Sequence, residues 1–187
     1  MHRRDFLLRS LIAALAVAFA PGVCAHTPYR QWKVLRERFL LVHSTRSDPV
    51  SDSIAGQLVA ILDDVLPTAR AMVARAPDEQ RIASLMTTGQ AVLSVMRSDQ
   101  AVDLYMGRGA FGGFNGEQLR WMVTCGDHRL VTVASFPRHH AWLVTAALSE
   151  NGAALDIRPP SGDANDIAVP PHPGALAFAR GESLDAQ

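Results

Sequence analysis

The alternation of apolar and polar positions predicts a strand, a loop and a helix between residues 39 and 66. Residues 39–42 form a short apolar run, typical of a strand buried on both faces. After a polar turn, apolar residues recur every three or four positions, as on one face of a helix: Val50, Ile54, Leu58, Ile61 and Val65. Asp48 before Pro49 is typical of an N-cap followed by the first helical residue. In a parallel sheet, such a junction lies at the carboxyl edge, where ligands usually bind.

The same kind of pattern continues to residue 148. It predicts strands at 71–74, 91–96, 119–125 and 129–134, a helix that begins at 77, a helix capped by Ser98, and a helix over 137–148. Gly89 and Gly107 are expected to end the first two of these helices. Residues 156–163 are interpreted as an extended linker and 175–180 as a single helical turn. The expected fold class is therefore α/β, with a mostly parallel sheet flanked by helices.

The first 25 residues have the features of an export signal. Arg3 and Arg4 precede an apolar run at 11–20 that is too short to span a bilayer, and Val23 and Ala25 occupy the −3 and −1 positions of a cleavage site. The Arg-Arg-x-Phe-Leu pattern resembles a twin-arginine signal, with an ordinary secretory signal as the alternative. We expect cleavage after Ala25 and a periplasmic protein.

Cleavage changes the composition of the chain. It leaves 162 residues (187 − 25) with a charge of about −2 (15 basic − 17 acidic), which gives no electrostatic argument for binding nucleic acid. Cys125 is then the one cysteine left, so no intramolecular disulfide can form. It ends an apolar run and is interpreted as a buried structural thiol.

Three stretches resemble one protein family. Residues 92–111, VLSVMRSDQAVDLYMGRGAF, are similar to the strand, Ser-Asp, helix and Gly-x-Gly-x-Phe segment of TAXI solute-binding proteins, which are associated with TRAP transporters. Residues 119–123 and 130–133 resemble the family's Leu-Arg strand and the crossover strand after it. Residues 136–148 and 169–175, the latter reading VPPHPGA, resemble its closing helix and its Pro-x-His-Pro-Gly-Ala tail.

The resemblance implies a lobe like that of type 2 periplasmic binding proteins. Family members have two lobes that close over a solute, but here the crossover strand runs almost directly into the closing helix at 137. We therefore expect one lobe over 26–150 and an extended, proline-rich tail over 151–187 that packs on it. We also expect strands 119–125 and 129–134 to join the sheet and helix 137–148 to pack on that sheet, because its apolar residues need a surface to cover.

The candidate ligand residues lie in two loops. Arg46 and Arg108 carry guanidinium groups that match carboxylates, and we expect both at the carboxyl edge of the sheet. Together with Ser44, Thr45 and Ser47 they predict a site for a small carboxylate. The family's first loop is rich in glycine and has a tyrosine pair, which this chain lacks, so no ligand residue is transferred there.

Other chemistry receives less support. The histidines at 128, 139, 140 and 172 suggest a metal, but adjacent histidines on a helix point about 100° apart, so one of the pair 139–140 is expected to point away. His43, Ser44 and Asp48 suggest a triad, but no Gly-x-Ser-x-Gly motif is present. We expect neither an enzyme nor a cofactor. Two functions stay open: a solute-binding subunit for a TRAP-type transporter, and a single-lobe interaction module that binds a membrane permease or another copy of itself.

Overall fold

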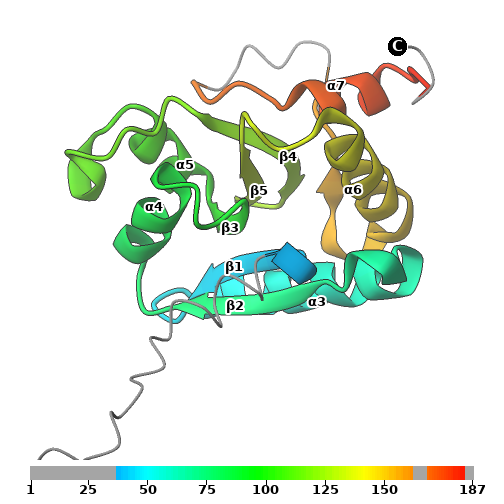
Figure 1. Cartoon of the computed structure of the whole chain (residues 1–187), viewed down its shortest axis with the longest axis horizontal. Helices are drawn as coiled ribbons and strands as arrows, with labels where there is room; N and C mark the ends of the chain where they lie inside the picture. Colours follow the sequence, from blue (N-terminus) through cyan, green and yellow to red (C-terminus); the bar gives the residue numbers. More distant parts are fainter. Residues whose placement is uncertain (1–36, 162–167, 184–187) are drawn as a thin grey trace, which may run out of the picture. The chain divides into compact units, whose positions relative to one another are not determined.

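A six-stranded mixed sheet, in the order β2-β1-β3-β5-β4-β6, organises the part of the chain that the computed structural model describes, residues 37–161 and 168–183 (Figure 1). The expected export signal at 1–25 lies outside the described residues. The strands are β1 Leu41–Thr45, β2 Met72–Ala76, β3 Leu93–Arg97, β4 Leu119–Cys125, β5 His128–Val133 and β6 Ile157–Arg158. The α-helices are α3 Pro49–Val65, α4 Glu79–Thr87, α5 Ser98–Tyr105, α6 Arg138–Asn151 and α7 Pro173–Ala179. Short 3-10 turns are η1 Pro67–Ala69, η2 Gly109–Phe111 and η3 Ala153–Leu155.

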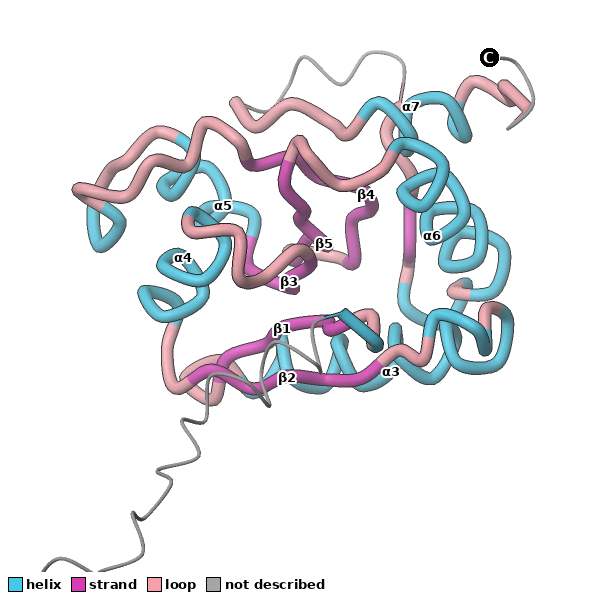
Figure 2. Tube along the Cα trace, in the orientation of Figure 1, coloured by secondary structure: helices cyan, strands magenta, loops and turns pink. Residues whose placement is uncertain are grey.

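Helices cover both faces of this sheet (Figure 2). The chain crosses from β1 outward to β2 and then back over β1 to β3, so right-handed crossovers place α3 and α4 on opposite faces. α6 packs against α3 and β4, while α5 packs against β3 and β5. The predictions that β4 and β5 join the sheet and that the helix after them packs on it are thus confirmed.

The sheet is mixed, so the expectation of a mostly parallel sheet is wrong. β1 pairs in parallel with β2 and β3, but β5 is antiparallel to both β3 and β4, and β6 is antiparallel to β4. β4 and β5 are antiparallel because only the two-residue turn Gly126-Asp127 joins them, with φ +57° at the glycine. So short a connection cannot join parallel strands. β5 lies between β3 and β4, and since these two strands point the same way, it runs against both.

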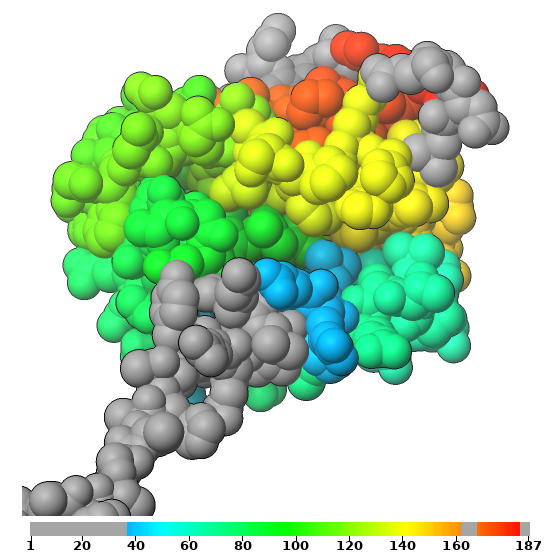
Figure 3. All heavy atoms as spheres, in the orientation of Figure 1, coloured from blue at the N-terminus to red at the C-terminus, as the bar shows by residue number. Residues whose placement is uncertain are grey.

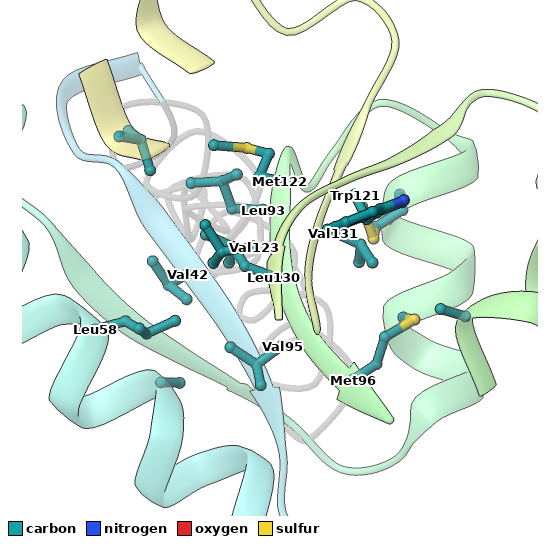
Figure 4. Close-up of a cluster of buried hydrophobic side chains, with 14 of the residues drawn as sticks. Val42, Leu58, Leu93, Val95, Met96, Trp121, Met122, Val123, Leu130 and Val131 are labelled. Carbon is teal, nitrogen blue, oxygen red and sulfur yellow. The ribbon is translucent and has the colours of Figure 1, made fainter. Parts of the chain in front are cut away.

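Buried apolar side chains form one core around this sheet (Figure 4). Val42 and Leu93 are paired positions and share the face of the sheet toward α3, where Leu58 packs. Trp121 and Val131 are likewise paired and lie on the other face.

The apolar stripe of α3 lies slightly off the predicted one. Its buried residues are Ser51, Ile54, Ala55, Leu58 and Leu62. The expectation is confirmed for Ile54 and Leu58, whereas Val50 and Val65, at the two ends, are 55% and 38% exposed. Helix ends extend past the sheet, and there a regular spacing of apolar residues no longer guarantees burial.

The tail after residue 151 has more structure than an extended segment. Residues 157–158 pair with β4, so the linker interpretation is wrong there, and Pro171 bridges to Trp121. His172 caps α7 by accepting from the Gly174 N–H, and its Nε2 lies 2.9 Å from the Phe136 carbonyl. A side chain at 174 would collide with the Arg138 carbonyl and the Ala141 methyl group, so glycine lets α7 approach α6 closely. No helix in the described residues is long and apolar enough to span a membrane.

Candidate functional site

A polar groove lies at the carboxyl edge of the sheet, where β1 and β3 end and β5 begins. Its volume is about 430 Å3. We call it the carboxyl-edge groove and define it by the described residues that line it: Asp48, Val50, Arg97, Ser98, Asp99, Asp127 and His128. The N-termini of α3 and α5 both open at this groove, so backbone N–H groups with a partial positive charge gather here.

Asp48 occupies the N-terminus of α3. As predicted, it is the N-cap, and its Oδ1 accepts from the N–H groups of Val50 at 3.0 Å and Ser51 at 3.3 Å. Its other oxygen, Oδ2, is 2.8 Å from Nε2 of His128. Burial by itself would raise the pKa of Asp48, but the hydrogen bonds from His128 and from these two N–H groups outweigh it and hold the pKa below its usual value.

No side chain caps α5, but Asp99 in its first turn accepts from one N–H group there. Its Oδ1 accepts from the Gln100 N–H at 2.9 Å, and both oxygens accept from Arg97, at 3.0 Å and 2.7 Å. The hydrogen bond from Arg97 is the main reason why the pKa of Asp99 is lowered. The expectation that Ser98 caps this helix is wrong, because Ser98 is its first residue and makes no cap bond. Both helix N-termini at the groove thus already hold a carboxylate of the chain itself.

The hydroxyl of Ser98 also makes its hydrogen bonds within the protein, as both donor and acceptor. It donates to the Asp127 carbonyl at 2.9 Å and accepts from Nε of Arg129 at 3.0 Å. Arg129 is buried in β5, with its guanidinium 4.8 Å above the Trp121 ring. Ser98 therefore joins α5 to the turn between β4 and β5.

The predicted ligand residues of the first loop bind to the flanking helices. Ser44 is fully buried and donates to Asp52 of α3 at 2.8 Å. Thr45, also buried, and Ser47 both donate to Glu79 of α4, at 3.4 Å and 2.9 Å. These three hydroxyls tie β1 to a helix on each face of the sheet. A ligand would reach them only by displacing those carboxylates.

The two predicted arginines lie apart from the groove lining. Arg46 is exposed and its N–H donates to the Ala76 carbonyl. Arg108 forms an ion pair with Asp103 at 3.3 Å, and its N–H donates to the carbonyl of the same residue. Neither arginine is among the described residues that line the carboxyl-edge groove. The structure therefore places all five predicted ligand residues outside this lining.

His128 is the groove residue that the sequence pattern missed. It falls between the strands predicted at 119–125 and 129–134, but it is the first residue of β5, and its side chain is 9% exposed and bonded to Asp48. The partners are 80 residues apart in sequence, so no local spacing indicates the pair. The one available signal was a histidine at the start of a strand that follows a glycine turn.

The other histidines form neither a triad nor a metal cluster in the described residues. A ring nitrogen of His43 lies 3.1 Å from the Leu93 carbonyl, while Ser44 bonds to Asp52. The triad suggested by the sequence is therefore not assembled. The rings of His139 and His140 lie 3.9 Å apart, so the expectation that one of them points away is wrong. Within 37–161 and 168–183, no group of three or more His, Cys, Asp or Glu side chains is placed to hold a metal.

Comparison with protein-family models found no match, and comparison with curated proteins found none either. What the structure defines is the class: an α/β protein with a six-stranded mixed sheet and a polar groove at the carboxyl edge of its parallel strands.

Proposed function

We propose that this protein is an exported, one-lobe relative of TAXI-type solute-binding proteins, and that it acts as an interaction module whose carboxyl-edge groove binds a protein partner. One observation favours a protein partner over a free solute. The anion positions at both helix N-termini are already filled by Asp48 and Asp99. A free carboxylate would have to compete with carboxylates that the fold holds in place.

The strand order supports the type 2 binding-protein lobe. Three parallel strands are followed by β4, which points the same way as they do, and by the reversed strand β5 inserted between β3 and β4. In a two-lobed relative the chain has to leave this sheet and return to it. Here Gly126 and Asp127 alone connect β4 to β5, in keeping with the loss of a second lobe.

A single lobe offers the carboxyl-edge groove only one wall. Small-molecule sites usually bury 70–90% or more of the ligand, which needs surfaces on opposite sides. A protein partner supplies its own second wall. The exposed Val50 at the groove gives such a partner an apolar contact beside the charged groups.

The charge of the groove indicates the chemistry of the partner. Three carboxylates, Asp48, Asp99 and Asp127, line it together with one arginine, Arg97, which is bonded to Asp99. The excess of negative charge favours a partner surface rich in Lys and Arg, such as a loop of a membrane permease. It disfavours a second copy docked groove to groove, since like charges would then meet.

The alternative is the small-carboxylate site first predicted from the sequence. The exposed Arg46 favours it, because its guanidinium lies on the same loop as Ser47 at the carboxyl edge. Against it, Ser44, Thr45 and Ser47 already donate to Asp52 and Glu79.

Photo-crosslinking tests the proposal in cells that export the full chain. A benzoylphenylalanine residue at position 50 lies at the groove, while the same residue at position 65 lies at the other end of α3 and serves as the matched control. We expect an adduct with one partner from position 50, its loss on adding Asp127→Lys, and none from position 65. Adducts of equal yield from both positions would contradict the proposal.

Titration calorimetry separates the two functions. A panel of dicarboxylates and amino acids is titrated into the purified protein and into the Arg46→Gln variant. We expect no saturable heat for any of them. Saturable binding that is lost in Arg46→Gln would overturn the partner proposal in favour of the carboxylate site.

A further inference from the structure

A second groove lies at the opposite, amino edge of the sheet. Its volume is about 570 Å3, within the usual range for small-molecule sites. Most of its lining is apolar and comes from the residues before β1, the end of α3, the start of β3 and the first half of α6: Phe39, Leu66, Val92, Phe136, Leu143 and Val144. Figure 3 shows the blue residues that lead into β1 beside the yellow helix α6. We call this the amino-edge groove.

The first turn of α6 reaches this groove without a cap. Pro137 stands at the N-cap and has no side-chain acceptor. Among residues 37–161 and 168–183 no side chain caps this helix, and its first turn contains no acidic residue. The first N–H bonded within the helix is that of Ala141, which donates to the Pro137 carbonyl. Pro137, His139 and His140 all line the groove.

This end differs from the starts of the other α-helices in the described residues. α3, α4 and α7 have Asp48, Asp78 and His172 as side-chain caps, and α5 has Asp99 on its Gln100 N–H. α6 is the longest of these helices after α3, so its N-terminal partial charge is not a product of a short turn. Unbonded N–H groups at such an end favour an anion.

Other side chains that line the groove add to this preference. Arg38, His139 and His140 line the groove, and Glu37 is the one carboxylate among the described lining residues. Burial and the neighbouring His139 lower the pKa of His140, so the ring is mainly neutral at pH 7 and still carries one N–H donor. Arg138, which does not line the groove, is paired with Glu182 at 3.0 Å.

We propose that the amino-edge groove binds an amphipathic monocarboxylate, with its apolar body along the apolar wall and its carboxylate at the N-terminus of α6. Charge complementarity favours a negative head group, because the helix end and Arg38 carry positive charge and the two imidazole rings offer N–H donors. The apolar wall of the groove favours a ligand whose remaining part is apolar. This site lies at the other edge of the sheet from the carboxyl-edge groove and does not depend on the function proposed for it.

Calorimetry with matched probes tests the head group and the body separately. Octanoate, octanol, octylamine and acetate are titrated into the full-length protein. We expect saturable one-to-one binding of octanoate, binding of octanol and octylamine that is about tenfold weaker or less, and no binding of acetate. Absence of saturable octanoate binding, or equal affinity for the three eight-carbon probes, would overturn the proposal.

A pair of variants at one position then identifies the helix end. Pro137→Asp places a carboxylate of the chain on the free N–H groups and should weaken octanoate binding about tenfold. Pro137→Ala removes the ring without adding an acceptor and should leave the affinity within about twofold of the original. Thermal melts of both variants verify that they fold. An unchanged affinity in folded Pro137→Asp, or an equal loss in both variants, would show that the carboxylate does not bind at α6.

Discussion

The helices that begin at the two edges of the sheet differ in whether a side chain of the protein accepts from their first N–H groups. At the carboxyl edge, α3 and α5 begin with N–H groups that bond to Asp48 and Asp99. At the amino edge, α6 begins after Pro137, and no side chain in the described part of the protein caps it. The comparison teaches that a helix N-terminus by itself does not define an anion site. What matters is whether the sequence places an acceptor there first.

The linings of the two grooves differ in the same sense. The carboxyl-edge groove is lined by charged, hydroxyl and imidazole side chains, with Val50 as the apolar exception. The amino-edge groove is mostly apolar, and its polar lining residues include His139 and His140 of the first turn of α6. One α/β layer structure thus presents a charged groove at one edge and a mostly apolar groove at the other.

The largest expected difference concerns Cys125, which ends β4 at the carboxyl edge. Burial, aided by the charge of Asp156, raises the pKa of this thiol to about 12. Its thiolate fraction at neutral pH should therefore be on the order of a thousandfold below that of an ordinary cysteine. We expect labelling by a disulfide reagent to be slower by a similar factor in the folded Cys24→Ser variant than in the urea-unfolded one. Fast native labelling would mean that the carboxyl edge opens readily.

Leu58→Ala should destabilise both edges together. Leu58 lies in the middle of α3, which reaches from one edge to the other, and its side chain is fully buried. Removing it should lower the free energy of unfolding by about 3 kcal/mol, measured by urea denaturation. Val65→Ala, at a position 38% exposed, is the control and should change it by less than about 0.5 kcal/mol. Two separate transitions in Leu58→Ala would show that the edges do not share one core.

Asp48→Ala should lower the free energy of unfolding by about 1–2 kcal/mol at pH 7, measured by urea denaturation. The substitution removes the acceptor for two N–H groups and the partner of buried His128. Asp78→Ala is the matched control. Asp78 caps α4 by one bond, to the Arg81 N–H, so its loss should cost less. An equal cost in the two variants would mean that His128 adds nothing to the cap.

The cost of Asp48→Ala should also depend on pH in a defined direction. The pKa of Asp48 is lower in the folded state than its ordinary value of 3.8. The stabilisation is therefore fully present above about pH 4 and is lost as the pH falls through the lower, folded-state pKa. Urea titrations at pH 7 and pH 3 should show the difference between the original protein and Asp48→Ala shrinking at pH 3. A difference that grows there would mean that folding raises the pKa of Asp48 and does not lower it.

The smallest expected effect is a gain in stability from a substitution at the amino edge. Relative to Pro137→Ala, Pro137→Asp should raise the free energy of unfolding by about 0.5–1 kcal/mol, because the new carboxylate accepts from the first turn of α6 and faces its positive end. Differential scanning calorimetry at low salt measures it. No gain over Pro137→Ala would imply that the N–H groups of α6 are already satisfied.

The sequence predicted the local features of the fold well. The Asp48-Pro49 helix start and the glycine stops at 89 and 107 are confirmed, and both glycines have positive φ. These signals work because each depends on a few neighbouring backbone groups. The insertion of β5 between β3 and β4 depends on pairing across the chain, and the short turn at 126–127 fixes only one of its two neighbours.

The candidate site was harder to predict for the same reason. A loop of serine, threonine and arginine has the composition of an anion site, and Ser44 and Ser47 do make charged hydrogen bonds. Their acceptors are carboxylates of the protein, eight and 32 residues away. Composition indicates that hydroxyls bind acids, but only packing decides whether the acid belongs to a ligand or to the next helix.

The position of β5 also has a consequence for the order in which the chain folds. During synthesis, β1, β2 and β3 emerge first, and β3 then presents one open edge to which β4 does not pair. That edge can close only after residue 133 has emerged, because β5 is the strand that pairs with it. A chain stopped earlier exposes the unpaired edge of a strand in which four of five residues are buried in the finished protein, a surface prone to aggregation. Ribosome-bound chains ending just before and well after residue 133 should therefore differ sharply in solubility.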